Sequence, residues 1–205
     1  MVRDLAPVLS GPVVRAANAL LGCVLTANGV AVRLSEVEAY DGVGLDEASH
    51  AHRGRTPRNG IMFGPAGYAY LYFTYGMHWC LNVVTGPVGQ ASAVLLRAGT
   101  VIDGLDTARG RRPATSDRDL ARGPARLTMA LGLDGAANGT FLLDPEATVR
   151  LEPPTARIPQ ARVHSGPRVG VAGAADRPWR FWLGDEPSVS VYRRHVPRRR
   201  TSAAG

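Results

Sequence analysis

The chain has 205 residues, which is enough for one substantial hydrophobic core and short for two. Apolar residues make up 45%, and with 24 Gly and 15 Pro the composition indicates a globular, loop-rich protein. No run approaches the roughly 20 apolar residues of a membrane span, and the first residues lack a signal-peptide core, so we expect a cytoplasmic protein.

Charge excludes one kind of chemistry and favours one kind of partner. The net charge is +7, and all 24 positively charged side chains are Arg, because the chain contains no Lys. Imine catalysis through a lysine is therefore excluded. The positive charge favours a phosphate-bearing partner. Cys23 and Cys80 lie far apart without metal-ligand spacing, so we expect free thiols in a reducing compartment.

The first third of the chain predicts a helix, a hairpin and a long loop. Residues 8–22 have the pattern of a short amphipathic helix. Two β-rich runs, 23–26 and 30–40, flank an Asn-Gly dipeptide that is typical of a hairpin turn. Residues 41–67 are irregular and rich in Gly, Pro, Arg and His, a length of surface loop that is usually associated with function.

A second hairpin is expected where four of the six tyrosines gather. Between Tyr68 and Val84, alternating β-formers lead into a turn at Tyr75-Gly76 and out into another β-rich run. Aromatic rings on a protruding hairpin can stack on flat rings or wedge between stacked ones, and in a basic chain nucleobases are the first candidates. The alternative is that these tyrosines are ordinary core and cross-strand side chains.

The remaining residues complete one mixed α/β domain. A further strand is expected over 91–98, a helix near 102–111 and another helix over 123–131, followed by short strands. Residues 193–205 are rich in Arg and predict a disordered basic tail that adds non-specific attraction for phosphates.

The second β-rich run carries two glutamates, Glu36 and Glu38. Strict alternation places them on one face with Val32, Leu34 and Tyr40. Two carboxylates on an apolar strand face are unexpected, because burying a charge costs several kcal/mol unless it is paired. Their spacing of about 7 Å suits an inverting glycosidase, and a carboxylate beside an aromatic ring is a candidate general base. The alternative is that they pair with arginines at a sheet edge.

The long loop contains histidines and arginines. His50 and His52 could bind a metal ion, but no third ligand has a suitable spacing, so we expect no metal site. A basic cluster suited to phosphate oxygens consists of Arg53, Arg55, Thr56 and Arg58.

Two polar residues interrupt apolar strands. Arg97 closes the run Ala-Val-Leu-Leu-Arg, and an Arg in a buried strand needs a carboxylate or phosphate partner. Asn82 lies inside an apolar strand and needs hydrogen-bond partners, so it is either structural or reads a base edge.

Eight motifs occur in order along the chain: Glu36-Val-Glu-Ala-Tyr40, Asp46-Glu-Ala-Ser-His50, Arg55-Thr-Pro-Arg-Asn59, Met62-Phe-Gly-Pro65, Tyr70-Leu-Tyr-Phe-Thr-Tyr-Gly-Met77, Cys80-Leu-Asn-Val83, Val94-Leu-Leu-Arg-Ala98 and Gly123-Pro-Ala-Arg-Leu127. Together they resemble the alkyladenine (3-methyladenine) DNA glycosylase family, the branch found in bacteria and mammals. The resemblance extends from about Ala17 to Val191. It implies an α+β fold: a single compact domain, residues 1–192, with a curved antiparallel β-sheet, surrounding helices and a protruding β-hairpin.

The function implied by the resemblance is that of a monofunctional DNA glycosylase of base excision repair. Such an enzyme flips an alkylated or deaminated purine out of the duplex and hydrolyses its N-glycosidic bond, leaving an abasic site. The expected partner is double-stranded DNA with a damaged purine, bound by a monomer at the nucleoid. No cofactor and no metal are implied.

The resemblance also implies a catalytic pair and a base pocket. Glu38 would be the general base that activates water for attack on the sugar carbon, and Arg97 would help to hold that water. The residues that match the family's base pocket are Tyr40, His50, Tyr72 and Asn82. The Asn82 amide would disfavour normal guanine through its exocyclic amino group.

DNA contacts follow from the same resemblance. Tyr75 matches the residue that fills the gap left by the flipped nucleotide, and Met77 would lie beside it in the minor groove. Arg55 and Thr56 would contact phosphates. A wedge and an aromatic pocket together offset the few kcal/mol that flipping costs.

From the residues alone, two other functions stay open. One is a carbohydrate-active hydrolase that uses Glu36 and Glu38 and acts on glycans without DNA. The other is a non-catalytic nucleic-acid-binding module whose tyrosines only stack on bases. Excision of a base from DNA separates both from a glycosylase.

Overall fold

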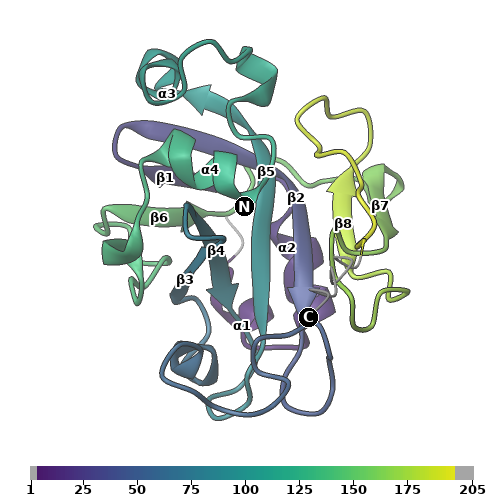
Figure 1. Ribbon diagram of the computed structural model, residues 1–205. Helices are drawn as coiled ribbons and strands as arrows, with labels where there is room; N and C mark the ends of the chain where they lie inside the picture. Colours follow the sequence, from purple (N-terminus) through teal and green to yellow (C-terminus); the bar gives the residue numbers. More distant parts are fainter. Residues whose placement is uncertain (1–3, 197–205) are drawn as a thin grey trace, which may run out of the picture.

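The computed structural model describes residues 4–196, in which an eight-stranded sheet curves around helices (Figure 1). Every strand pairing in the sheet is antiparallel. The strand order is β3-β4-β5-β2-β1-β6, and β7 and β8 continue the sheet beside β2. The predicted α+β architecture with a curved antiparallel sheet is therefore confirmed.

The strands are β1 (Val24–Ala27), β2 (Val30–Tyr40), β3 (Ala69–Thr74), β4 (His78–Val84), β5 (Ala93–Asp103), β6 (Val149–Glu152), β7 (Val163–Gly166) and β8 (Arg180–Leu183). The α-helices are α1 (Ala6–Leu9), α2 (Val13–Leu20), α3 (Leu105–Arg111) and α4 (Pro124–Leu131). Short 3-10 helices cover Gly60–Phe63, Asp117–Asp119, Gly135–Ala137 and Gln160–Arg162. No helix in the described part of the chain is long and apolar enough to cross a membrane.

Two predicted elements differ from the observed ones. The single helix expected over 8–22 is two helices, α1 and α2, because Pro12 is extended (ψ 136°) and cannot donate a helical hydrogen bond. The strand expected over 91–98 continues to Asp103, so α3 begins later than predicted. Of the predicted tail 193–205, residues 197–205 lie outside the described residues.

Helices α1, α2 and α4 pack with the sheet in one hydrophobic core. The core side of α2 follows the i, i+3, i+4, i+7 spacing of an amphipathic helix, with the buried residues Val13, Ala16, Ala17 and Leu20. Helix α4 contributes Leu127 and Leu131, both fully buried. Burying each such leucine contributes about 1.5–3 kcal/mol.

Strand β2 changes its side-chain alternation partway along. Its register with β5 shifts on both sides of Glu36. Four residues of β2, before and after this shift, pack in the same core: Val32, Leu34, Val37 and Ala39. The prediction that Glu36 and Glu38 share a face with Val32 and Leu34 is therefore wrong. The bulge turns both carboxylates to the face opposite the core, where polar partners are available.

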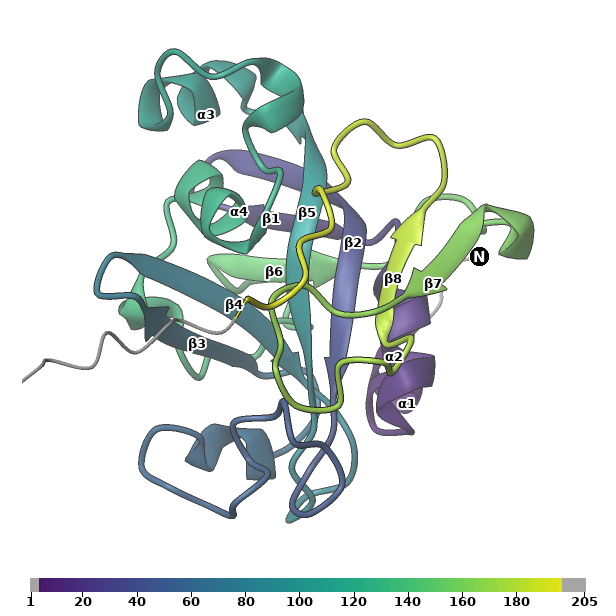
Figure 2. The ribbon, with the colours of Figure 1, turned by 45° about the vertical axis from the view of Figure 1, so that its right-hand side comes forward.

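The tyrosine-rich hairpin is formed by β3 and β4, and it projects from the body of the sheet (Figure 2). Only residues 82–84 of β4 pair with β5, so the outer part of the hairpin extends past its neighbour strand. The predicted protruding hairpin is therefore confirmed.

Strand β5 is pressed against β2 at Gly99, and this predicts a specific sensitivity. A Cβ at residue 99 would lie 2.5 Å from the carbonyl oxygen of Arg33 and would also clash with Val32. We expect Gly99→Ala to lower the free energy of unfolding by about 1–3 kcal/mol, because backbone cannot yield as a flexible side chain can. The measurement is the urea midpoint with its m-value.

Gly110→Ala is the matched control. Gly110 lies in α3 with nothing within 4 Å of an added Cβ, so the substitution is expected to be neutral or to stabilise by up to about 1 kcal/mol. Equal midpoints for the two variants would contradict the proposed steric origin.

Candidate active site

A cavity of about 340 Å³ opens beside the β3–β4 hairpin. Its lining comes from β2, the loop after β2, the hairpin, β5, the start of α4 and residues 169–171. The sequence-predicted site residues among the lining are Tyr40, His50, Tyr72, Tyr75, Asn82 and Arg97. Tertiary folding thus brings together residues from distant parts of the chain, and combined aromatic and ionisable groups make this cavity the candidate site.

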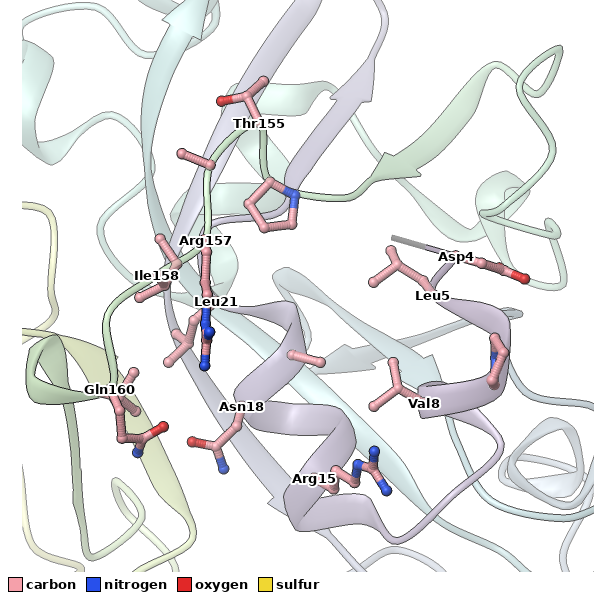
Figure 3. A pocket seen from close by; sticks show the side chains of 15 residues that line it. Asp4, Leu5, Val8, Arg15, Asn18, Leu21, Thr155, Arg157, Ile158 and Gln160 are labelled. Carbon is pink, nitrogen blue, oxygen red and sulfur yellow. The ribbon is translucent and has the colours of Figure 1, made fainter. Parts of the chain in front are cut away.

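A larger cavity of about 1090 Å³ lies elsewhere, between α1, α2 and residues 154–163 (Figure 3). Its lining includes Arg15 and Arg157, and Figure 3 shows both among apolar and uncharged polar side chains such as Leu21 and Asn18. The carboxylate of Asp4, also in the lining, accepts a hydrogen bond from the Ala6 amide at the start of α1 (3.0 Å). None of the sequence-predicted site residues lines it, so size alone does not identify the active site.

Glu36 is fully buried and closely bound by cations. Its Oε1 accepts hydrogen bonds from Arg97 Nε (2.8 Å) and Arg180 Nε (2.7 Å), and its Oε2 accepts one from the Ser190 amide (2.7 Å). Burial alone would raise the pKa of Glu36, but Arg97, Arg180 and the Ser190 amide hold it below its usual range. Glu36 therefore stays ionised as a structural anion. The alternative that the glutamates pair with arginines is confirmed, but the pairing occurs inside the sheet, because β2 lies between β5 and β1.

Glu38, also fully buried, lies directly behind the cavity wall. Its Oε2 accepts hydrogen bonds from the Tyr40 hydroxyl (2.7 Å) and Arg97 Nη1 (3.2 Å). Its Oε1 accepts one from the Val169 amide (2.7 Å). All three donor residues line the cavity. An ionised carboxylate can accept about four hydrogen bonds, so Oε1 retains capacity for one more donor.

Arg97 joins the two carboxylates, which confirms the prediction that it has a carboxylate partner. In the β2–β5 register Ala98 pairs with Glu36 and Leu96 with Val37, so Arg97 falls at the bulge without a cross-strand partner. Burial alone would lower the pKa of Arg97, but Glu38 and Glu36 hold it above its usual range. The guanidinium is therefore a permanent cation at the cavity wall.

The hydroxyl of Tyr40 retains its proton. Burial, and then the neighbouring charge of Glu38, raise the pKa of Tyr40 well above its ordinary value. The phenol can therefore donate to Glu38 while its ring remains part of the cavity lining. Tyr40 thus links the carboxylate to an aromatic surface.

A second aromatic group in the cavity lining consists of His50, Tyr70 and Tyr72. The His50 and Tyr72 rings lie edge to face with centroids 4.5 Å apart, and His50 Nδ1 is 2.9 Å from the Tyr70 hydroxyl. Burial, and then the charge of Arg58, lower the pKa of His50, so its imidazole is neutral at pH 7. Asn82 Nδ2 donates to the carbonyl of Tyr70 (3.0 Å), which fixes the orientation of its amide.

Sequence reasoning missed Arg168, which is fully buried. Its two terminal nitrogens donate to both oxygens of Asp46 (2.6 and 2.7 Å), and its guanidinium carbon lies 4.6 Å from the centre of the Tyr40 ring. It also donates to the Ala39 carbonyl (2.9 Å). Arg168 therefore joins the end of β2, the loop that carries His50 and the segment that carries the Val169 amide. The available signal was an Arg inside an otherwise turn-like Gly-Pro-Arg-Val-Gly run.

The hairpin tip presents two large apolar side chains. Tyr75 is 84% exposed and Met77 is 66% exposed. Both Tyr75 (φ 53°) and Gly76 (φ 67°) have positive φ, and the Met77 amide bonds to the Thr74 carbonyl (3.2 Å), as in the tight turn that suits a hairpin. A tyrosine with positive φ is uncommon, and backbone strain of this kind is concentrated at functional sites. Tyr75 is therefore not a core residue.

The predicted phosphate ligands Arg55 and Thr56 are exposed in the loop after β2. Arg55 lies over the Phe63 ring (5.7 Å), and the Thr56 amide bonds to Asn59 Oδ1 (2.6 Å). Neither residue lines the cavity. Their contact with DNA stays a prediction. Within residues 4–196, no three His, Cys, Asp or Glu side chains are arranged to hold a metal ion.

Comparison with known proteins gives a consistent result. The family model for methylpurine-DNA glycosylase (MPG) matches residues 8–187. The chain is 59% identical over 184 residues to a protein of Nocardia farcinica, covering 87% of this chain and 86% of the relative. It is 52% identical over 195 residues to one of Streptomyces avermitilis (92% and 91%) and 50% identical over 187 residues to one of Mycobacterium tuberculosis (88% and 90%). All three are provisionally named 3-methyladenine DNA glycosylases.

The Asp46–Arg168 pair generates a stability prediction. Asp46→Asn leaves the Arg168 charge buried without a counterion, and loss of one partner of such a pair costs about 3–5 kcal/mol. Urea denaturation should show this loss. Asp106→Asn, which removes an exposed partner of Arg109 on α3, should leave the midpoint nearly unchanged. Similar losses in both variants would argue against a special role for the buried pair.

The same pair fixes the direction of the pH dependence. Burial alone would raise the pKa of Asp46, but the hydrogen bonds and charge of Arg168 bring it below its usual value. The unfolded chain therefore binds the proton more tightly, and this stabilisation is complete above about pH 4 and lost as the pH falls through the folded-state pKa. Asp46→Asn should flatten the fall in stability below about pH 4. An unchanged pH profile would contradict the linkage.

Proposed function

The chain belongs to the methylpurine-DNA glycosylase family, and we propose that its 340 Å³ cavity receives a damaged purine rotated out of duplex DNA. The protein is a DNA glycosylase of base excision repair, a hydrolase of N-glycosyl bonds. One arrangement supports the proposal. Glu38, bound by Tyr40, Arg97 and Val169, lies behind an aromatic cavity, and the exposed Tyr75 side chain lies beside that cavity.

Base flipping needs compensation for lost stacking and pairing, a cost of a few kcal/mol. The Tyr75 ring, projecting from the hairpin tip, enters the duplex and replaces the departing base in the stack, with Met77 in the minor groove. The extruded purine stacks between Tyr40 and the pair formed by His50 and Tyr72. Asn82, held by its bond to the Tyr70 carbonyl, disfavours normal guanine through its exocyclic amino group.

Hydrolysis then follows from the position of Glu38. Its unfilled acceptor capacity at Oε1, next to the Val169 amide, orients a water molecule, while Arg97 and Tyr40 bind Oε2 and hold the carboxylate in place. The water oxygen attacks C1′ of deoxyribose, its proton passes to Glu38, and the electron pair of the C1′–N bond leaves with the purine. An alkylated, positively charged purine leaves as a neutral base, so it needs no strong acid.

The product is an abasic site with an intact strand. A lyase step usually requires an amine that forms an imine, and the chain has no lysine. The enzyme is therefore monofunctional in this proposal. It works as a monomer in the cytoplasm, at the nucleoid, and the net charge of +7 with Arg55 and Thr56 supports contacts with phosphates.

The carbohydrate-hydrolase alternative is disfavoured by the state of Glu36. Glycoside hydrolysis with two carboxylates requires both groups to act on the substrate, one as acid and the other as base or nucleophile. Glu36 is fully buried, and both of its oxygens accept hydrogen bonds from Arg97, Arg180 and Ser190, so it is not available for either role.

Glu38→Gln tests the general base. We expect excision to fall about 10²–10⁴-fold, because the amide cannot accept a proton from water, while binding to lesion DNA is retained. The measurement uses a duplex with one hypoxanthine or one 7-methylguanine, followed by alkali and a sequencing gel. Glu152→Gln, at a half-exposed carboxylate on β6, is the matched control and should excise normally. Equal excision by Glu38→Gln would remove Glu38 from the mechanism, and loss of binding would point to misfolding.

Tyr75→Ala tests the wedge. Stacking of one base on an aromatic ring is worth about 1–3 kcal/mol, so affinity for lesion DNA should fall roughly tenfold to a hundredfold. Fluorescence anisotropy with lesion and undamaged duplexes measures the difference. Tyr75→Phe should retain most of the affinity, and Val88→Ala, at a 71% exposed loop residue, should have no effect. Unchanged lesion affinity in Tyr75→Ala would make Tyr75 a structural turn residue.

A further inference from the structure

Each aromatic side of the cavity carries a guanidinium group on one of its rings. Arg168 lies over Tyr40 (4.6 Å), and Arg58 lies over Tyr72 (5.5 Å). The two cations differ in their partners. Arg168 is neutralised by the bidentate pair with Asp46, whereas no carboxylate in the described residues forms an ion pair with Arg58.

Although Arg58 is exposed, its guanidinium makes a hydrogen bond to the hairpin, and the residue after it is anchored in the loop. Its Nη2 donates to the Phe73 carbonyl on β3 (3.1 Å). The next residue, Asn59, is buried and donates to the carbonyls of His50 (2.8 Å) and Gly54 (3.0 Å). The hydrogen bond and the anchored backbone together place the guanidinium beside the Tyr72 ring of the cavity lining.

The charge of Arg58 reaches the other rings on this side of the cavity. After burial, Arg58 is the second cause of the lowered pKa of His50. For Tyr70, burial raises the pKa, and Arg58 opposes that rise. An uncompensated positive potential therefore covers the rings on which an extruded base would stack.

We propose that Arg58 is a specificity-determining residue that reduces the advantage of positively charged over neutral damaged purines. A purine alkylated at N7 or N3 is a cation, and stacking on an electron-rich ring attracts it. The Arg58 guanidinium already lies over the Tyr72 ring, so a positively charged purine stacked on that ring is repelled by the charge of Arg58. Hypoxanthine is neutral and escapes this repulsion. The inference rests on the proposed function, because it concerns which purine the cavity accepts.

If Arg58 only contacted phosphates, its removal would change the rates for charged and neutral lesions alike, whereas a specificity-determining residue changes the ratio of the two rates. Removing a positive charge that only attracts the DNA backbone weakens both kinds of lesion duplex equally. The ratio of kcat/KM for 7-methylguanine to kcat/KM for hypoxanthine, measured in the same duplex sequence, cancels that common effect. Intrinsic differences between the two leaving groups cancel when each variant's ratio is divided by that of the wild-type protein.

The test compares three variants of the full chain. Arg58→Gln should raise the ratio on the order of fivefold, the size expected for two unit charges about 4 Å apart that water screens fully, as suits an exposed side chain. Arg58→Lys keeps the charge and should keep the ratio close to that of the wild type. Arg53→Gln removes the same charge from another exposed residue of this loop, and its ratio should stay within about twofold of the wild type.

Three outcomes would overturn the inference. If the ratio in Arg58→Gln is unchanged, Arg58 is only a phosphate contact. If Arg53→Gln raises the ratio as much as Arg58→Gln does, the effect comes from net charge. If Arg58→Lys raises the ratio as much as Arg58→Gln does, the effect comes from the shape of the side chain. Failure of the wild-type protein to release either base would overturn the proposed function itself. That failure is visible in the wild-type reactions alone, so failure of the proposed function can be distinguished from failure of the inference about Arg58.

Discussion

The structure depends on one buried guanidinium, that of Arg97, shared between Glu36 and Glu38. Removing charges from water costs several kcal/mol for each ion unless hydrogen bonds and opposite charges compensate. Here the compensation is unequal. Glu36 receives Arg97, Arg180 and two groups of Ser190, whereas Glu38 receives Arg97, a phenol and one backbone amide. The two acidic residues therefore differ: Glu36 is a fully bound structural anion, whereas Glu38 retains hydrogen-bond acceptor capacity at one oxygen.

The bulges between β2 and β5 make this network possible. A regular strand would place both glutamates among the core leucines and valines, where no partner could satisfy them. The register shift around Glu36 turns them to the opposite face and leaves Arg97 without a cross-strand neighbour, so that its side chain is directed at both acids. β8 pairs with this same stretch of β2 and brings Arg180 to Glu36. The register shift therefore keeps both charges out of the apolar core and forms the Glu36–Arg97–Glu38 network beside the cavity.

Rigid and exposed parts of the site have different roles. The Arg168–Asp46 pair fixes the ring of Tyr40 and the loop before His50, and the Asn59 bonds fix the loop after it. At the hairpin tip, by contrast, Tyr75 extends into solvent at positive φ. This division suits the proposed mechanism, in which one side chain enters the duplex and several hold the extruded base.

Short-range patterns in the sequence were sufficient for the two hairpins, for the exposed tip at Tyr75 and for the need of Arg97 for an acid, because turn chemistry and buried charge act over a few residues. The ordered motifs were sufficient for the family. Tertiary structure alone decided which glutamate keeps free acceptor capacity, and it supplied Arg168 and the Val169 amide. These partners lie more than a hundred residues from β2 in the chain, with Val169 and Glu38 separated by 131 positions. Alternation along one strand cannot reveal a register shift against another, since that shift depends on which residues the neighbouring strand presents.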